Sequence, residues 1–283
     1  MLSLTDSLPL HPLATLRLSA ASALVCRGEQ FWVLADDALT LQRYDLAGAW
    51  QAELQLLPGE LPTDPQQRKA QKPDFEALLH LPDGRLLALG SGSTAARCRA
   101  CLVSGEQVQV INLQPLYQVL GAHFQALNIE GALVYQGQLL LAQRGNGRGR
   151  ENALVCLELT AVLADLARGQ LTAVGLQQIV PLVLPELDGV ALSLTDLALS
   201  PGGVLYFSAT AEDTDSSYRD GACLGSVLGR LDQQWAINQL LCLQPVVKIE
   251  GLAFQAEGRL LLVTDADDPT VAAPLFSLDL PAE

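Results

Sequence analysis

Short apolar runs recur along the chain, and each is opened by a small polar or acidic residue. The runs are ASALV, FEALLHL, IEGALV, TDLALS and IEGLAF, and the opening residues are Ser22, Glu76, Glu130, Asp196 and Glu250. The intervals between these residues are 54, 54, 66 and 54 positions. A pattern that recurs at a nearly fixed period is typical of a repeat architecture. The sequence therefore predicts five copies of one structural unit.

The second unit shows the plan of one copy. Apolar residues alternate over 76–81, a Pro-Asp-Gly turn follows at 82–84, and 86–89 is the predicted hairpin partner. Two further strands are predicted over 99–103 and 107–113. Four antiparallel strands form the blade of a β-propeller. We therefore expect each unit to be one blade.

The two ends of the chain complete the predicted circle. The last unit supplies only three strands, whereas a spare strand over 13–18 precedes the first unit. Pairing that strand with the last unit closes the ring and removes its exposed edges. In the third unit, a predicted helix over 161–168 accounts for part of the longer interval. The expected fold is an all-β, five-bladed propeller in one domain, 1–283; the alternative, a β-sandwich followed by a small domain, fits the in-phase repeat less well.

This fold is expected to bring the five opening residues together. The first strand of each blade lines the central channel, so the five opening residues form a ring on one face. The loops after the second strands lie on the same face. They contain the acidic pair Asp36 and Asp37, Ser91 and Ser93, Arg144 and Asn146, and Asp265.

A ring with four carboxylates needs compensation for its charge. At about 6 Å and an effective dielectric near 20, each neighbouring pair costs roughly 3 kcal/mol. Protonation, water or a bound cation can offset this repulsion. An all-oxygen set suits calcium, with magnesium as second choice, and the absence of histidine disfavours zinc, copper and nickel. The alternative is that these side chains accept hydrogen bonds from backbone amides and channel water.

Arg144 leaves the second strand of the third unit and is expected near the ring. An arginine beside a cation can hold phosphate or carboxylate through two parallel hydrogen bonds. The alternative is an ion pair with Glu130 or Asp196. We assign the binding of an anionic ligand to Ser91, Ser93, Asn146 and Asp265.

Composition limits the remaining classes of function. The net charge of −14 argues against a general nucleic-acid surface and suits cation binding. Apolar stretches are only strand-length, and the N-terminus lacks the features of a secretory signal, so we expect no membrane association and a cytoplasmic location. Six scattered cysteines do not suggest a disulfide framework.

Two resemblances follow from these motifs. The ring of Ser22, Glu76, Glu130, Asp196 and Glu250, with FWVLADDALTLQRYDL in the first blade, resembles the calcium-dependent apyrases, five-bladed nucleotidases with calcium in a Ser/Glu ring. This chain departs from that family at Ala23, where an acidic residue is expected, and at Ala38 and Leu39, which replace an arginine. The segments IEGLAF and GRLLLVTDADD resemble phytase-like and esterase-like bacterial propellers, so the chain is also similar to uncharacterised members of that group.

These observations predict a metal-binding propeller with calcium in the ring and a small, phosphate-bearing anionic ligand above it. As an enzyme it would hydrolyse a phosphoester or phosphoanhydride. The metal would polarise the phosphoryl oxygen, Asp36 or Asp37 would accept a proton, and Arg144 would stabilise negative charge. The alternative is a non-catalytic scaffold or ligand sensor with a structural metal or none.

Overall fold

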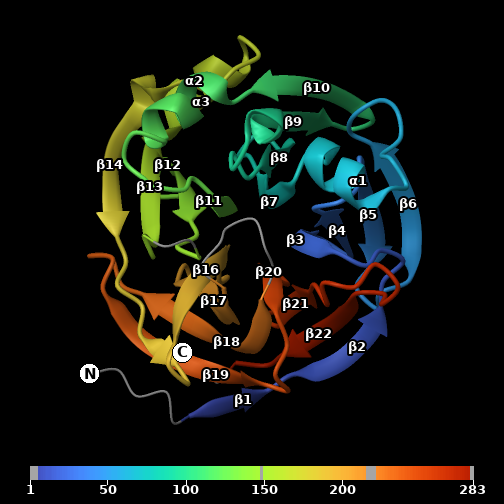
Figure 1. The fold of residues 1–283 in the computed structure, drawn as a ribbon, viewed down its shortest axis with the longest axis vertical. Helices are drawn as coiled ribbons and strands as arrows, with labels where there is room; N and C mark the ends of the chain where they lie inside the picture. The colour runs from blue at the N-terminus through green and yellow to red at the C-terminus, as the bar shows by residue number, and fades with distance from the viewer. Residues whose placement is uncertain (1–5, 147–148, 215–220, 281–283) are drawn as a thin grey trace.

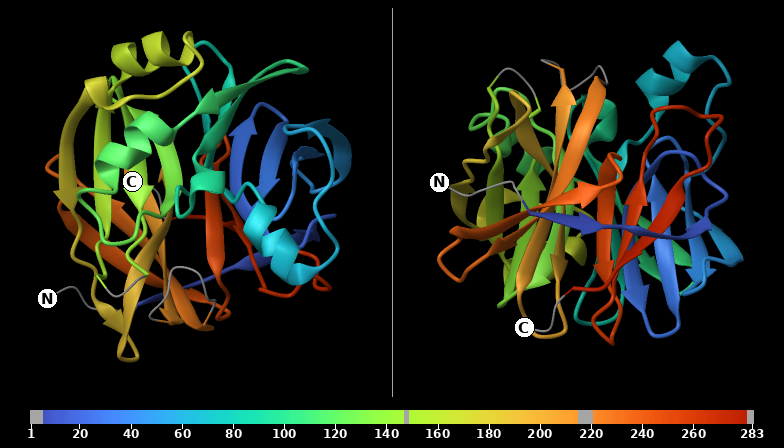
Figure 2. Two further views of the ribbon diagram at one scale, coloured as in Figure 1. Left: turned by 45° about the horizontal axis from the view of Figure 1, so that its top comes forward. Right: turned by 90° about the horizontal axis from the view of Figure 1, so that it is seen from below.

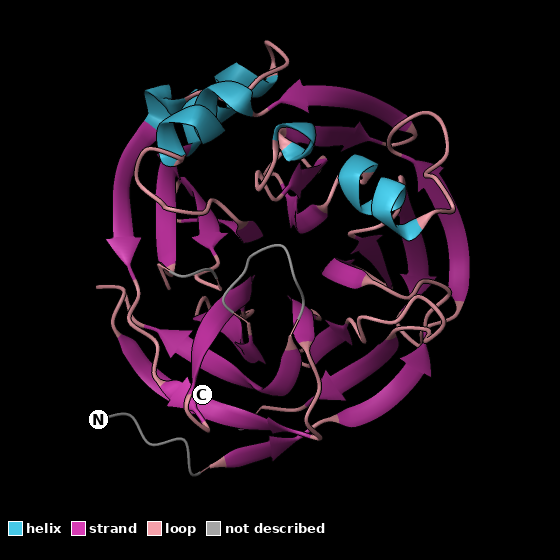
Figure 3. Cartoon of the chain, in the orientation of Figure 1, coloured by secondary structure: helices cyan, strands magenta, loops and turns pink. Residues whose placement is uncertain are grey.

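Five antiparallel sheets surround a central axis in the computed structural model, which describes residues 6–146, 149–214 and 221–280. Each sheet extends from the axis to the rim, as Figure 1 shows in the view down that axis. Strands dominate and the helices lie between and above them (Figure 3). The predicted five-bladed β-propeller is therefore confirmed. The expected domain limits, 1–283, include residues outside the described ranges.

The strands of each blade follow one another in the chain from the axis outward. Blade 1 contains β3 (Ala21–Arg27), β4 (Gln30–Ala35), β5 (Thr40–Asp45) and β6 (Trp50–Gln55). Blade 2 contains β7 (Phe75–His80), β8 (Leu86–Gly90), β9 (Arg99–Ser104) and β10 (Gln107–Asn112). Blade 3 contains β11 (Ile129–Tyr135), β12 (Gln138–Gln143), β13 (Ala153–Glu158) and β14 (Leu176–Pro181).

The last two blades include strands from the N-terminal segment. Blade 4 contains β16 (Val190–Leu199), β17 (Leu205–Asp213), β18 (Ala222–Leu231) and β19 (Ile237–Gln244), and the short β15 (Glu186–Leu187) pairs with β16. Blade 5 contains β20 (Ile249–Phe254), β21 (Leu260–Thr264) and β22 (Pro274–Leu278). Its outer strand is β2 (His11–Thr15), antiparallel to β22, so the predicted closure is confirmed with the strand displaced from 13–18. The preceding β1 (Ser7–Pro9) was not expected and pairs in parallel with β19 (Figure 2).

Three α-helices and two short 3-10 turns, at Ala95–Arg97 and Ala173–Gly175, lie outside the sheets. Helix α3 (Leu159–Leu166) confirms the helix expected in the third unit. Helices α1 (Pro65–Gln71) and α2 (Gln114–Leu120) were not expected. Helix α1 buries none of its residues, so its sequence lacks the apolar periodicity of a packed helix, although Asp64 caps it by accepting the N–H of Gln67. No helix in the described residues is long and apolar enough to cross a membrane.

The core consists of five apolar clusters, each between two neighbouring blades. The inner strands of neighbouring blades approach one another closely. A Cβ added to Gly131 of β11 would lie 2.8 Å from the Cα atom of Asp196, and one added to Gly251 would lie 3.0 Å from the Cα atom of Ala23. The glycines that follow Glu130 and Glu250 therefore allow the inner strands to pack tightly around the axis.

Each inner strand contains a β-bulge, near its start in blades 1, 2, 3 and 5 and in the middle of the longer β16 in blade 4. In blades 1, 2, 3 and 5 the bulged residue, left out of the strand register, is the predicted ring residue: Ser22, Glu76, Glu130 and Glu250. In blade 4 the bulged residue is Thr195, and Asp196 pairs regularly with Ser208. Successive side chains of a strand point to opposite faces, so a displacement of one residue changes where Asp196 lies.

Candidate functional site

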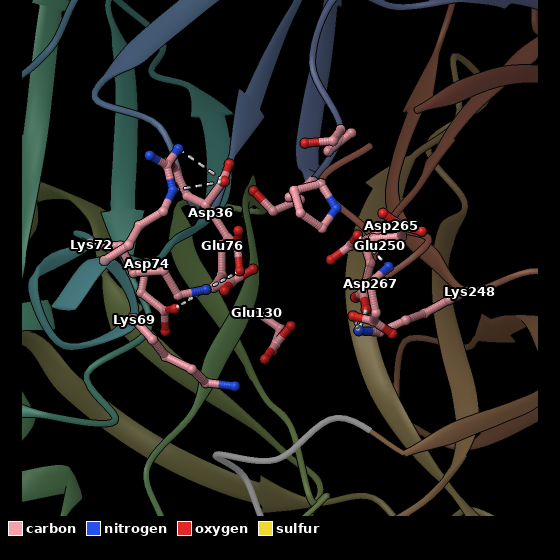
Figure 4. A pocket seen from close by; sticks show the side chains of 18 of the residues that line it. Asp36, Lys69, Lys72, Asp74, Glu76, Glu130, Lys248, Glu250, Asp265 and Asp267 are labelled. Atoms are coloured by element: carbon pink, nitrogen blue, oxygen red, sulfur yellow. Dashed lines mark hydrogen bonds and ion pairs between the residues drawn. The ribbon is translucent and has the colours of Figure 1, made fainter. Parts of the chain in front are cut away.

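A cavity of ≈ 570 Å³ opens at the face where the inner strands begin. Among the described residues, ten carboxylates and six basic side chains line it. Figure 4 shows two facing groups, which we name by their position. The α1 wall contains Lys72, Asp36, Asp74 and Glu76, and the blade 5 wall contains Lys248, Glu250, Asp265 and Asp267. The lining carries a net negative charge.

The cavity brings together most of the residues singled out in the sequence. Those that line it are Ser22, Glu76, Glu130, Glu250, Asp36, Asp37, Arg144, Asn146 and Asp265. Asp196, Ser91 and Ser93 are not among the lining residues. Ser91 supports the cavity indirectly, because its hydroxyl donates to Asp74 Oδ2 at 2.5 Å.

Ser22 and Asp196 connect neighbouring blades through the backbone. The Ser22 hydroxyl donates to the Phe75 carbonyl at 2.5 Å. The two carboxylate oxygens of Asp196 accept the N–H groups of Leu197, at 2.7 Å, and Leu252, at 2.8 Å. In blade 4 the bulge falls at Thr195, and the carboxylate of Asp196 contacts backbone amides of its own blade and of blade 5 instead of lining the cavity. The contacts of Asp196 therefore match the alternative of hydrogen bonding to backbone amides, whereas Ser22 donates to a backbone carbonyl.

Arg144, at the end of β12, is buried among three carboxylates. Its Nη1 atom lies 3.2 Å from Glu130 Oε2 and 3.4 Å from Glu250 Oε1, and its Nη2 atom lies 2.7 Å from Glu212 Oε2. Its Nε atom donates to Ser193 Oγ at 3.2 Å. The pairing with Glu130 that the sequence left as an alternative is present. Arg144 thus offsets carboxylate charge at the axis, and Glu212 is a partner that sequence reasoning missed.

Lys248 organises the blade 5 wall. Its ammonium lies 3.1 Å from Glu250 Oε1 and 2.9 Å from Asp267 Oδ1. Burial acts to lower the pKa of Lys248, but Glu250 and other nearby carboxylates raise it well above its usual value. Burial also raises the pKa of Asp265 to about 8, although Lys248 acts in the opposite direction.

The α1 wall contains the densest group of carboxylates. Asp36, Asp74 and Glu76 each offer an oxygen within 4.8 Å of the others. The Lys72 ammonium binds Asp36 Oδ2 and lies 2.9 Å from Asp74 Oδ1. Arg97 Nη1 lies 2.7 Å from Asp74 Oδ2. Asp74 was missed in the sequence because it does not occupy a repeated position.

Glu76 differs from its neighbours because no described residue donates a hydrogen bond to its carboxylate. Burial raises the pKa of Glu76 well above its usual value, and the charges of Glu130, Asp74 and Asp36 add to the effect. Burial is also the main reason why the pKa of Asp36 rises to about 6, despite the attraction of Lys72. The α1 wall is therefore short of positive charge at Glu76.

Asp37 holds helix α1 at the rim. Arg68 donates from Nε and Nη2 to Asp37 Oδ2, at 3.1 and 3.0 Å, and from Nη2 to the Asp37 carbonyl at 2.6 Å. Because two nitrogen atoms of Arg68 donate to Asp37, the contact fixes the orientation of both side chains. The carboxylate of Asp37 is consequently engaged, whereas Asp36 shares the cluster with Glu76.

We expect the stability of the metal-free protein to fall as pH rises from about 4.5 to 8. Burial raises the pKa of Glu130 from 4.5 to about 8, against the attraction of Arg144. Between these values the folded state binds more protons than the unfolded state, so increasing pH favours unfolding. Melting temperatures measured in EDTA across this pH range test the expected fall in stability. Glu130→Gln should flatten the curve, and a slope equal to that of the wild type would contradict this account.

Comparisons with known proteins agree with the fold. A family model described as a family of unknown function, DUF6929, matches residues 17–280. The crystal structure of Myxococcus xanthus glutaminyl cyclase is similar at 15% identity and a TM-score of 0.55, over 97% of this chain and 99% of that one. The structure of U3-55K is similar at 11% identity and a TM-score of 0.47, over 99% and 100%. At 15% identity, the likeness to the glutaminyl cyclase shows the fold alone. No curated protein matches the chain.

Proposed function

The chain belongs to the DUF6929 family of unknown function, and we propose that its axial cavity binds calcium at the α1 wall together with a small anionic ligand. The observation that carries the proposal is the carboxylate of Glu76. It lies in the cluster with Asp36 and Asp74, and no described residue donates to it. A bound cation would offset the repulsion that raises the pKa of Glu76.

The chemistry of the α1 wall favours calcium over other ions. Asp36, Asp74 and Glu76 offer oxygen atoms only, which suits a hard cation. Calcium accepts roughly six to eight oxygens in flexible geometry, whereas magnesium requires a tighter octahedron. Three carboxylates leave coordination positions open for oxygens of a phosphate or carboxylate ligand. A bound calcium would therefore allow the negatively charged cavity to bind the anionic ligand predicted from the sequence.

Hydrolysis of a phosphoester or phosphoanhydride is the catalytic extension of this proposal. Calcium would polarise the phosphoryl oxygen. Asp36, with a pKa of about 6, would be ionised near neutral pH and would accept a proton. The guanidinium of Arg144 already donates to carboxylates of the protein, so we give it the role of positioning Glu130 and Glu250. Calcium binding without turnover would instead favour a structural ion in a ligand sensor or scaffold.

Calcium should raise the melting temperature of the wild type, because an ion that binds only the folded state stabilises it by mass action. The measurement is thermal unfolding during a calcium titration after EDTA treatment, with magnesium in parallel. Glu76→Gln should reduce the calcium shift strongly. Asp83→Asn removes a carboxylate from the exposed turn beside Arg85 and should leave the shift intact.

The outcomes separate binding from catalysis. A wild-type melting temperature that does not respond to calcium would remove the metal proposal, and equal shifts in both variants would remove its location at the α1 wall. A panel of nucleotides and phosphate esters then tests turnover with and without calcium. At calcium concentrations that saturate the variant, calcium-dependent turnover that falls about 100-fold or more in Asp36→Asn would support Asp36 as the general base. Unchanged turnover would exclude Asp36 from that role.

A further inference from the structure

Among the described residues that line the cavity, the buried side-chain atoms without a hydrogen-bond partner are both acceptors. Glu250 is 4% exposed, and its Oε2 atom has no hydrogen-bond partner among the described residues. The buried Oδ1 atom of Asn146 is likewise unpartnered within the described chain. Both residues line the cavity, as Glu76 does. A buried acceptor without a donor is costly, so these atoms indicate where a ligand donates hydrogen bonds.

The cationic groups beside these acceptors are already engaged. Arg144 donates to Glu130, Glu212 and Glu250, and the Lys248 ammonium binds Glu250 Oε1 and Asp267. Because the contacts with Glu250 are made to Oε1, the other carboxylate oxygen, Oε2, has no hydrogen-bond partner among the described residues. The group that completes this part of the cavity must therefore bring its own N–H or O–H donors.

The surroundings of Glu250 favour a single positive charge over a second divalent ion. Arg144 and Lys248 both contact Glu250 Oε1, and they would repel an ion of charge two more strongly than a monocation. The amide oxygen of Asn146 is neutral and adds no charge. An ammonium with three N–H donors matches this combination of one carboxylate oxygen and one amide oxygen.

The lining also distinguishes among ammonium ligands. No aromatic residue is among the described residues that line the cavity. Quaternary ammonium groups have no N–H donors and are bound mainly by aromatic faces. A primary ammonium, in contrast, is bound by carboxylates, as Lys248 shows on the same wall. The cavity volume of ≈ 570 Å³ lies within the range of small-molecule sites.

We propose that the cavity binds a small aliphatic primary amine whose ammonium donates to Glu250 Oε2, with Asn146 Oδ1 as a further acceptor. The site combines Glu250 of the blade 5 wall, which lies opposite the calcium cluster of the α1 wall, with Asn146, which follows β12 in blade 3. It goes beyond the proposed function, because it requires no metal. A molecule with an ammonium at one end and an anionic group at the other would reach both walls.

The test uses n-butylamine as the probe, with EDTA present so that calcium plays no part. Isothermal titration calorimetry at pH 7.5 and constant ionic strength should give saturable binding to the wild type. Tetramethylammonium, with the same charge and no N–H, should bind at least about tenfold more weakly, since hydrogen bonds to charged groups contribute this much. Glu250→Gln should weaken n-butylamine binding by about tenfold or more.

Two further variants keep the result interpretable. Asn146→Ala removes the second acceptor without touching the ion pairs of Glu250 and should also weaken binding, so it serves if Glu250→Gln fails to fold. Asp83→Asn should bind like the wild type. Absence of saturable n-butylamine binding, equal binding of tetramethylammonium, or unchanged affinity in the folded site variants would overturn the proposal. Because EDTA is present throughout, each outcome is independent of the calcium result.

Discussion

Arg144→Leu should destabilise the protein by about 3–5 kcal/mol, because removing one partner of a buried ionic group leaves the others uncompensated. The guanidinium is 4% exposed and lies within 3.4 Å of Glu130, Glu212 and Glu250. After the substitution, Lys248 is the basic residue that still contacts Glu250. Urea denaturation followed by the fluorescence of the three tryptophans measures the loss.

Two controls separate the loss of this compensation from a general effect of removing arginine. Arg259 forms an exposed pair with Asp279, and Arg259→Leu should cost at most about 1 kcal/mol. Lowering the pH should reduce the deficit of Arg144→Leu, because protonation removes the charge of the carboxylates left behind. Equal losses in the two arginine variants, or a deficit that does not depend on pH, would contradict the role given to Arg144.

Lys72→Met should make the stability of the protein strongly dependent on calcium. The Lys72 ammonium binds Asp36 and Asp74, and its side chain is 12% exposed. In EDTA the variant should lose about 3 kcal/mol or more, since it leaves buried carboxylates without this partner. Calcium should then produce a larger rise in melting temperature than in the wild type, because the ion replaces the missing ammonium.

Lys248→Met is the matched control for this second prediction. It also removes a buried lysine from two carboxylates, but on the blade 5 wall. We expect destabilisation in EDTA without the enlarged response to calcium. If calcium rescues both lysine variants equally, the ion does not select the α1 wall. If calcium rescues neither variant, the proposal that calcium offsets the charges of Asp36, Asp74 and Glu76 is wrong.

The sequence predicted the blades well because each blade repeats its hydrophobic pattern. It placed Ser22, Glu76, Glu130 and Glu250 on one face because they occupy equivalent positions in the first strands of repeated blades. Asp196 shows the limit of that reasoning. Its acidic side chain suggested that it occupies the same position as Glu76 and Glu130, but the bulged residue of blade 4 is Thr195. An insertion of one residue is invisible in an apolar run, yet it reverses the face on which a side chain lies.

The partners of the ring residues were harder to predict than the ring itself. Lys72 and Glu212 contact residues far away in the chain, and no local pattern specifies such pairs. Asp74 precedes an inner strand with φ of 54°, a backbone conformation that a side-chain pattern does not reveal. The repulsion expected within the ring was therefore real, but much of the compensation comes from basic side chains of the protein itself.

The pairing of β2 with β22 has a consequence for the order of folding. Residues 11–15 find their partner only when residues 274–278 are available, so β2 closes a blade whose other strands come from the opposite end of the sequence. During synthesis, blades 1 to 3 can form from strands adjacent in sequence, while the edge of blade 5 stays open until the end. Contacts between such distant segments slow folding and prolong the exposure of an unpaired edge. Ring closure is thus expected to be the slow, aggregation-sensitive step in the biogenesis of this protein.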